Sequence, residues 1–297
     1  MITMSPSIES TLREWSRSFD PQLESCLRHY DDVPDELLRA MRHSLLAPAK
    51  RLRPFLVERS YRLAGGTDDR IVSLCVAVEC LHTFTLIHDD LPAMDDAELR
   101  RGQPSNHSVF GEAIAILAGD ALLALGLELA GEACADPGKA LEITRLLSRT
   151  IGGQGVIGGQ VADLLGEHLP ADMTTTRQIH LKKTATFFEA CCACGALAAH
   201  ADDQVFNKLS KYGLRLGLAF QIADDLLDAT GETSTLGKRP GRDSGKGKQS
   251  YPSVVGIEVS RKLGSQVTQT AIEALADFDG QADELRQVAL FVMNRNH

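Results

Sequence analysis

The sequence has few segments that could form β-strands. Alternation of apolar and polar residues, which a half-buried strand requires, is scarce along its 297 residues. Ala and Leu, both strong helix formers, dominate the apolar stretches instead. No low-complexity linker divides the chain, and no repeat of about 20–50 residues is visible. We therefore predict an all-α fold with a single domain over residues 1–297.

Neither a secretory signal nor a membrane span is predicted. Residues 1–20 lack a basic segment followed by an apolar stretch. The most apolar run, 113–130, is interrupted by Asp120 and Glu128, which favours a buried core helix. The seven cysteines include no Cys/His quartet with zinc spacing. They fit small buried side chains in a reducing cytosol, so we expect a cytoplasmic protein.

Other functional classes lack the residues that they need. The net charge of -9 disfavours nucleic-acid binding unless a strong local basic surface overcomes the overall field. The segment 153–158 fits GxGxxG, but no predicted strand precedes it, so we reject dinucleotide binding. No convincing Ser/His/Asp or Cys/His arrangement suggests a side-chain nucleophile.

Helical patterns cover most of the chain. They are expected near residues 7–30, 34–47, 51–64, 70–90, 109–134, 138–150, 156–166, 174–200, 202–228, 252–276 and 281–294. The segment 231–252 differs, because it is rich in Gly, Lys and Arg. A loop of this length inside a compact domain is usually a lid, a binding loop or disordered. We interpret it as a cationic lid, and the alternative is a solvated basic loop.

One group of carboxylates lies on the helix predicted at 202–228. Gln221, Asp224, Asp225 and Asp228 are spaced at i, i+3, i+4 and i+7, so they share one face of an otherwise apolar helix. A solvent-facing polar stripe is the alternative, but it would place like charges together for no gain. We favour a site for Mg²⁺, which prefers oxygen ligands.

A second group of carboxylates ends the helix predicted at 70–90. Asp89 and Asp90 come first, Pro92 disfavours further helix, and Asp95 can return from a turn toward Asp89. His82 shares a polar stripe with Asp89 inside this apolar helix. A satisfied core histidine is the alternative for His82, but its alignment with Asp89 indicates a polar cavity.

Three basic groups accompany the carboxylates. They are Lys50-Arg51-Leu52-Arg53, Arg100-Arg101-Gly102 and Lys182-Lys183-Thr184. Each alone is more often a solvated patch. Arg offers a planar fork of donors to phosphate and Lys a point charge, so together with two carboxylate clusters they indicate a diphosphate substrate.

These motifs resemble those of bacterial short-chain trans-prenyl diphosphate synthases, and most of all the farnesyl diphosphate synthases. The first aspartate-rich motif of that family is similar to residues 86–95 followed by 99–102, and the second is similar to residues 220–228. Residues 179–184 resemble the family's Lys-Thr motif, and 236–252 its lysine-bearing loop. The match spans roughly residues 45–256, in the family's order. Ala49, Ala185 and Arg242 depart from the usual pattern without removing a ligand or a phosphate-binding charge.

The resemblance implies about ten helices around a deep central cavity, a homodimer, and three Mg²⁺ ions bound together with the substrate diphosphate. The implied metal-binding residues are Asp89, Asp90, Asp95, Asp224, Asp225 and Asp228. The residues implied to bind the allylic diphosphate or shield the cation are Arg100, Lys183, Thr184, Gln221 and Lys238, and all of these except Arg100 are the implied catalytic residues. Those implied to bind isopentenyl diphosphate are Lys50, Arg53, His82 and Arg101.

The expected reaction condenses isopentenyl diphosphate with dimethylallyl or geranyl diphosphate to give farnesyl diphosphate. In the resembling family, an aromatic residue at the position of Phe84, with four residues between the aspartates as in Asp90 to Asp95, goes with a fifteen-carbon product. The alternative is that Phe84 is merely a core residue. A geranylgeranyl diphosphate synthase is the first alternative. A terpene cyclase would not need a second diphosphate site, and a non-catalytic regulatory subunit would be expected to lose one aspartate cluster.

Overall fold

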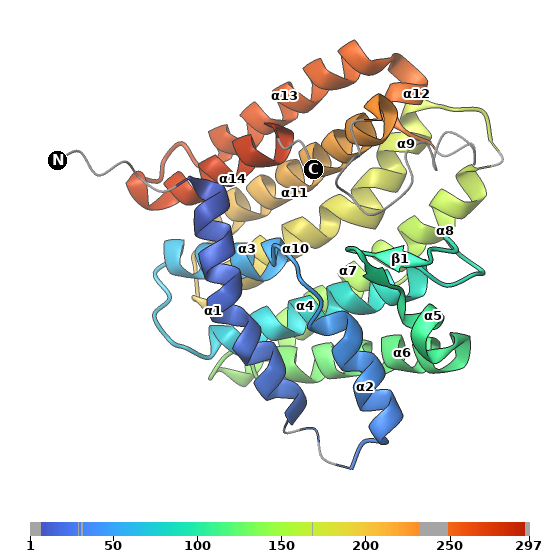
Figure 1. Ribbon diagram of the computed structural model, residues 1–297. Coiled ribbons are helices and arrows are strands. Elements are labelled where there is room, and N and C mark those ends of the chain that lie inside the picture. Colours follow the sequence, from blue (N-terminus) through green and yellow to red (C-terminus); the bar gives the residue numbers. More distant parts are fainter. Residues whose placement is uncertain (1–6, 29, 31, 168, 232–248, 295–297) are drawn as a thin grey trace.

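The computed structural model describes residues 7–28, 30, 32–167, 169–231 and 249–294, and these are mostly helical (Figure 1). The α-helices are α1 (Ile8–Arg28), α2 (Asp35–Leu45), α3 (Leu52–Leu63), α4 (Ile71–Asp89), α5 (Asn106–Phe110), α6 (Glu112–Gly131), α7 (Pro137–Ile151), α8 (Val156–Gly166), α9 (Met173–His180), α10 (Thr186–Ala198), α11 (Asp203–Thr230), α12 (Tyr251–Val255), α13 (Ile257–Ala274) and α14 (Asp283–Asn294). A π-helical turn, η1 (Leu181–Ala185), joins α9 to α10, and a 3-10 turn, η2 (Gly280–Ala282), precedes α14. A short antiparallel hairpin pairs β1 (Leu99–Arg100) with β2 (Gln103–Pro104).

The predicted all-α fold is confirmed, with two differences in how helices are divided. The predicted helices 109–134 and 252–276 are each broken by a glycine. Gly111 has φ 80° and ψ 161°, and Gly256 has φ 81° and ψ 162°. Residues with a Cβ rarely adopt this conformation, so glycine allows a sharp change of direction there. The result is a short helix before each long one, α5 before α6 and α12 before α13.

The helices pack in a continuous series around one large core. Helix α4 packs between α3 and α6, α10 packs between α3 and α11, and α11 packs between α10 and α13. Figure 1 shows α1 and α2 crossing the face of this bundle. The core extends from Leu12 of α1 to Val292 of α14. Because α4 has neighbours on several sides, it is apolar nearly all round, as its sequence predicted.

Among the described residues, two helices are long and apolar enough to cross a membrane by length and composition alone. They are α4 and α6, with 67% and 39% of the relevant window buried in the protein. They pack extensively against each other within the bundle. This packing fits core helices, as expected for the run 113–130. The seven cysteines are all free thiols, and five of them are buried.

Candidate active site

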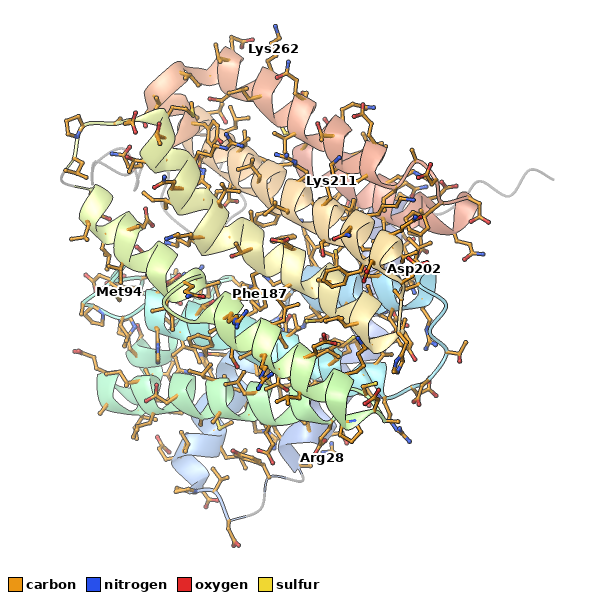
Figure 2. The ribbon with its side chains drawn as sticks, turned by 180° about the vertical axis from the view of Figure 1, so that it is seen from behind. Arg28, Met94, Phe187, Asp202, Lys211 and Lys262 are labelled. Carbon is orange, nitrogen blue, oxygen red and sulfur yellow. The ribbon has the colours of Figure 1, made fainter. Side chains whose placement is uncertain are left out.

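A cavity of about 1140 Å³ runs through the middle of the bundle and contains the predicted site. Phe187, near the middle of Figure 2, and Met94, toward one edge, both line it. The predicted site residues that line the cavity are Lys50, Arg53, His82, Phe84, Asp89, Asp95, Arg100, Arg101, Lys183, Thr184, Gln221, Asp224, Asp225 and Asp228. Asp90 lies just behind this wall, and Lys238 lies outside the described residues. The structure therefore brings together motifs that are more than a hundred residues apart in the sequence.

The first carboxylate cluster forms at the end of α4. Asp89 is the last helical residue, and the chain then turns so that the Asp95 amide donates to the Asp89 carbonyl at 2.8 Å. This is the return that Pro92 led us to predict. Burial raises the pKa of the Asp89 carboxyl; the Lys183 ammonium opposes the shift, and neighbouring Asp95 adds to it. Partial burial beside another carboxylate makes this position attractive to a cation.

Asp90 binds an arginine instead of facing the cavity. Its carboxylate oxygens both lie 3.0 Å from Arg100 Nε, and Arg100 Nη2 also donates to it. Asp90 is 2% exposed, so its carboxylate is nearly sealed from water, whereas the Arg100 side chain stays partly exposed. The pair holds the Arg100 guanidinium at the cavity wall. The predicted metal-binding role of Asp90 stays a prediction.

The hairpin that follows positions the second arginine of the pair. Arg101 and Gly102 are the two central residues between β1 and β2, with φ values of 54° and 77°. Positive φ at both positions is typical of tight two-residue hairpin turns. Glycine adopts this conformation easily, whereas Arg101 is held in it by the hairpin. This hairpin was not predicted, because two-residue strands leave almost no pattern in the sequence.

The second carboxylate cluster lies on α11 as predicted, with its polar side chains facing the cavity. Within it, Asp225 is held firmly. Asp225 Oδ1 accepts a hydrogen bond from Gln221 Nε2 at 3.2 Å, and Oδ2 accepts one from the Tyr251 amide at 2.9 Å. His180 Nε2 lies 3.6 Å from Oδ2. Asp225 therefore orients the Gln221 amide, whatever else it binds.

The Lys-Thr motif lies on the π-helical turn η1. Such turns are frequent at functional sites because they displace side chains from the regular helical positions. Thr184 Oγ1 donates to Gln221 Oε1 at 2.8 Å, which leaves oxygen lone pairs of both side chains at the cavity wall. The sequence placed both residues in the site but did not predict this hydrogen bond.

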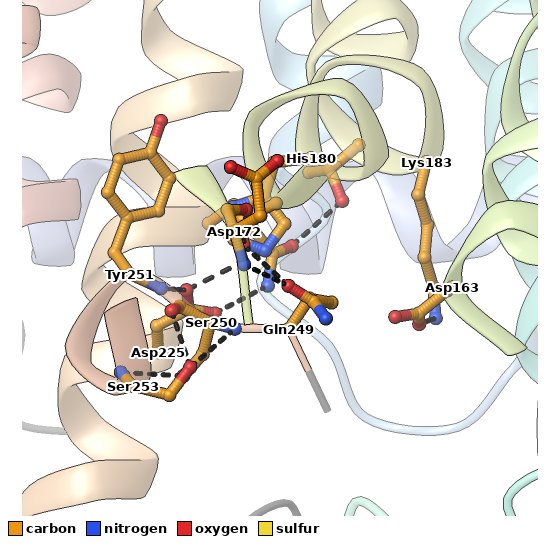
Figure 3. A network of polar contacts seen from close by, with 12 residues as sticks. Asp163, Asp172, His180, Lys183, Asp225, Gln249, Ser250, Tyr251 and Ser253 are labelled. Carbon is orange, nitrogen blue, oxygen red and sulfur yellow. Dashed lines mark hydrogen bonds and ion pairs between the residues drawn. The ribbon is translucent and has the colours of Figure 1, made fainter. Parts of the chain in front are cut away.

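Lys183 has a carboxylate partner that sequence reasoning missed. Its Nζ lies 2.6 Å from Asp163 Oδ2, and Figure 3 shows the two side chains pointing at each other. Asp163 comes from α8 and is 8% exposed. Gly159, also on α8, has no room for a Cβ against the Lys183 backbone, so α8 approaches η1 closely. The sequence did contain a signal for this partner, because Asp163 is a single carboxylate within the apolar segment of α8.

Gln249 is a second residue whose role was missed. Its Nε2 donates to the carbonyls of Gly166, Leu169 and Pro170, each at 3.2 Å. Its Oε1 accepts from the Asp172 amide at 3.0 Å and from Thr176 Oγ1 at 3.2 Å (Figure 3). One buried amide thus ties the α8–α9 connection to the segment that enters α12. This fixes the position of the Tyr251 amide, and through it Asp225.

The predicted isopentenyl diphosphate residues line the cavity from the loop before α3, from α3 and α4, and from the hairpin. Arg53 Nη1 lies 3.1 Å from His82 Nε2, and its guanidinium lies 4.7 Å from the Phe188 ring centroid. Burial lowers the pKa of His82 well below its usual 6.5, and the nearby arginines add to this effect, with Arg53 first. Neutral His82 therefore accepts a hydrogen bond from Arg53. Burial also lowers the pKa of Arg101 to about 10, which leaves it cationic at neutral pH.

Arg51, which stands between Lys50 and Arg53, serves the fold. It has φ 48°, and its side chain is fully buried. Its Nη1 lies 2.6 Å from Glu79 Oε1, its Nε 3.0 Å from Asp20 Oδ1, and its Nη2 donates to the Ala47 carbonyl. Glu79 of the polar stripe on α4 is thus paired with Arg51. This pairing fixes the loop that carries Lys50 and Arg53.

In the described part of the chain, no three Asp, Glu, His or Cys side chains lie close enough together to hold a metal ion by themselves. The two aspartate clusters instead face one cavity. Mg²⁺ is commonly bound by one or two carboxylates plus substrate phosphates, which is the arrangement that this donor set offers. The carboxylate oxygens fit the ion chemically.

Comparison with known proteins agrees with this geometry. Residues 34–288 match the family model described as polyprenyl synthetase. The chain is 43% identical over 267 residues to a dimethylallyltranstransferase of Fischerella ambigua, which covers 89% of this chain and 77% of that one. It is also 43% identical over 252 residues to geranylgeranyl pyrophosphate synthase 12, chloroplastic, of Arabidopsis thaliana, which covers 83% and 70%.

Solved structures show the same fold. An apo FPP/GFPP synthase of Zymomonas mobilis superposes with a TM-score of 0.86 at 33% identity, covering 96% of this chain and 98% of that one. A geranyltransferase of Helicobacter pylori, solved with magnesium and isoprenyl diphosphate, gives 0.84 at 29% identity and covers 98% of each. The chain belongs to the polyprenyl synthetase family. It is a short-chain trans-prenyltransferase, as the sequence motifs predicted.

Proposed function

We propose that the enzyme condenses isopentenyl diphosphate with dimethylallyl and then geranyl diphosphate to give farnesyl diphosphate. The observation that carries this proposal is one cavity whose lining combines two aspartate clusters, two separate basic groups and apolar side chains that include Phe84. A single anionic substrate would need only one of the basic groups. Two groups on different elements suit two diphosphates held at once.

The proposal includes Mg²⁺, three ions of which would bind together with the substrate diphosphate. Asp89, Asp95 and Asp224 would hold them, with Asp228 beside them on α11. Asp90 and Asp225 fit supporting roles, because their carboxylates are occupied by Arg100 and by Gln221 with the Tyr251 amide. Bound Mg²⁺ supplies charge neutralisation for a diphosphate leaving group. The magnesium-bound homologue from Helicobacter pylori supports this part of the proposal.

The residues of the chain account for the remaining steps. Arg100, Lys183 and Lys238 bind the allylic diphosphate and stabilise it as it departs. The oxygens of Thr184 and Gln221 face the cavity, where they stabilise a developing allylic cation. Arg53, His82 and Arg101, together with Lys50, hold isopentenyl diphosphate so that its double bond can attack that cation. The apolar wall excludes water, and the departing diphosphate accepts the proton that is lost.

The fifteen-carbon product rests on Phe84. This residue is 3% exposed, lines the cavity, and lies five residues before Asp89, roughly 7.5 Å back along α4. An aromatic ring there suits the floor of a cavity sized for a farnesyl chain. Geranylgeranyl diphosphate is the second candidate product, because the Arabidopsis thaliana relative carries that name at 43% identity. A non-catalytic regulatory subunit fits less well, since both aspartate clusters face the cavity.

Three further proposals concern the whole protein. We propose a single domain, since one apolar core contains residues from α1 to α14. We propose a homodimer, because Val109, Ile116 and Leu117 on α5 and α6 are 43–52% exposed and offer an apolar face to a second copy. A cytoplasmic location fits seven free thiols.

The test is a product assay with purified protein, isopentenyl diphosphate and each allylic starter, with Mg²⁺ or with a chelator. We expect farnesyl diphosphate from dimethylallyl and geranyl starters, and loss of product with the chelator. Geranylgeranyl diphosphate as the main product would select the second candidate. Absence of any elongated product with every starter would contradict the proposed function.

A further inference from the structure

The His88 side chain occupies a defined position in the cavity wall that the proposed mechanism does not use. It lies one turn after Phe84 on α4, and the two rings meet edge to face, with centroids 5.8 Å apart and planes at 82°. His88 Nε2 lies 3.1 Å from the Ile116 carbonyl of α6, to which it donates. Asp120 Oδ1 lies 3.9 Å from the same nitrogen. His88 thus links the predicted floor residue to α6.

A glycine on α6 makes this position possible. Gly119 is buried, and a Cβ added to it would overlap the His88 imidazole at Nε2, Cδ2 and Cε1. Any other residue at this position would therefore displace the ring. His88, Phe84, Asp120 and Leu123 line the cavity, whereas Gly119 does not. Gly119 therefore contacts the ring from α6, while the ring itself forms part of the cavity wall.

We propose that Gly119 and His88 are specificity-determining residues that set the product length together with Phe84. This inference rests on the proposed function. Gly119 lets the imidazole sit back against α6, the Ile116 carbonyl fixes it there, and the ring edge supports Phe84. The position of this wall then sets the depth available to the growing prenyl chain. Substitutions on the two sides of the contact, one at Gly119 and one at His88, should therefore move the wall in opposite directions.

The two directions follow from sterics. A methyl group in Gly119→Ala pushes the imidazole away from α6, toward the cavity and Phe84, so the space becomes shallower. His88→Ala removes the ring and its support for Phe84, so the space becomes deeper. The double variant should behave like His88→Ala, because the added methyl group then meets no ring. This non-additivity distinguishes a direct contact from two independent effects.

Gly126→Ala provides a matched control. Gly126 is also buried on α6 and also faces α4, where an added Cβ would overlap Leu81 and approach the Ala77 carbonyl. It lies two turns from Gly119 and does not line the cavity. Both variants gain similar helix propensity and both strain the α4–α6 contact. Only Gly119→Ala touches the His88 ring.

The experiment has two readouts. The first is product length from isopentenyl and dimethylallyl diphosphates. We expect Gly119→Ala to raise the ratio of ten-carbon to fifteen-carbon product about tenfold, the effect of roughly one methylene in an apolar pocket. His88→Ala should shift the product toward twenty carbons, while Gly126→Ala keeps the wild-type ratio even if its rate falls.

The second readout is ligand binding without turnover. Thermal shifts are measured with Mg²⁺ and geranyl, farnesyl or geranylgeranyl diphosphate, with inorganic diphosphate as the reference without a chain. Gly119→Ala should lose its preference for farnesyl over geranyl diphosphate, and His88→Ala should gain affinity for geranylgeranyl diphosphate. This readout stands even where a variant is catalytically slow.

The outcomes distinguish a failure of the inference about the wall from a failure of the proposed function. If the wild type elongates prenyl chains, but Gly119→Ala and His88→Ala keep its product ratio and binding preference, the inference about the wall is overturned alone. If Gly119→Ala does not fold, unchanged lengths with His88→Ala overturn the inference equally well. If the wild type makes no prenyl product, the proposed function fails. The inference about the wall then depends on the binding series, and it is overturned if both variants keep the wild-type preference for chain length.

Discussion

Lys183 of η1 and Asp163 of α8 form an ion pair of 2.6 Å at the wall of the central cavity. Asp163 is nearly buried, so its charge is held close to Lys183 with little competition from water. Without this partner, the long lysine side chain would regain rotamer freedom. The ion pair therefore points Lys183 toward the position proposed for the allylic diphosphate.

We expect Asp163→Asn to lower kcat/KM for the allylic substrate by about tenfold to a hundredfold, because misplacing a positioned group has a cost of this order. The KM for isopentenyl diphosphate should change little. Steady-state kinetics with each substrate varied will measure both effects. Lys182→Ala, a change at the exposed neighbour of Lys183, is the control and should leave both constants unchanged. Equal losses for the two substrates would argue against a positioning role.

Asp89→Ala and Asp224→Ala should each lower turnover by about a hundredfold or more, because each removes an oxygen ligand from the proposed metal site. Circular dichroism should show that both variants stay folded. Where activity remains, the Mg²⁺ concentration needed for half of the maximal activity should be higher than that of the wild type. Glu98→Ala, at an exposed carboxylate just after the first cluster, is the matched control. Near-normal turnover of either aspartate variant at ordinary Mg²⁺ would exclude the metal assignment.

The two diphosphate sites should be separable by kinetics. Arg101→Ala should mainly raise the KM for isopentenyl diphosphate, since Arg101 and Arg53 both act on the charge of His82. Lys238→Ala should mainly impair the allylic substrate; Lys238 is outside the described residues, so this half rests on the sequence motif. Varying each substrate in turn tests the division. Identical effects of both substitutions on both substrates would contradict it.

His82 should make the folded protein less stable in mild acid. Its pKa is well below 6.5 in the folded state, and burial among arginines is the cause. The unfolded chain therefore binds a proton at His82 as the pH falls below about 6.5, while the native state does not. Stability is therefore lost on acidification, with a slope from this group that starts near pH 7 and approaches about 1.4 kcal/mol per pH unit below 6.5. The free energy of unfolding, measured with urea at pH values from 7 to 5, should fall less steeply with pH for His82→Gln than for the wild type. Equal pH dependence of the two proteins would exclude His82 as the cause.

The sequence predicted the helices well, because the three- to four-residue repeat of apolar side chains that marks a helix lies within a single segment of the chain. Charged side chains at helical spacing in apolar helices also leave a strong signal, as at Asp224 and Asp228, and most of the residues that the sequence singled out line one cavity. It did not predict the breaks at Gly111 and Gly256, because a glycine within a helical pattern is compatible with both continuation and a turn. The π-helical turn that carries Lys183 and Thr184 likewise leaves no local pattern.

The missed residues depend on contacts between distant segments. Asp163 is a partner of Lys183 only because Gly159 brings α8 against η1. Gln249 meets the α8–α9 connection about eighty residues earlier in the chain. Arg51 looked like part of a phosphate-binding run, yet Glu79 and Asp20 hold it in the core. Such pairings are tertiary, so no local spacing rule reveals them.

The most direct test of this account compares the product lengths of the wild type and Phe84→Ala. Both are incubated with Mg²⁺, isopentenyl diphosphate and dimethylallyl diphosphate, and the dephosphorylated products are separated by chromatography. Removing the ring deepens the cavity without touching the aspartate clusters or the basic groups. We predict fifteen-carbon product from the wild type and twenty-carbon or longer products from Phe84→Ala. An unchanged fifteen-carbon product from Phe84→Ala would contradict the proposed floor.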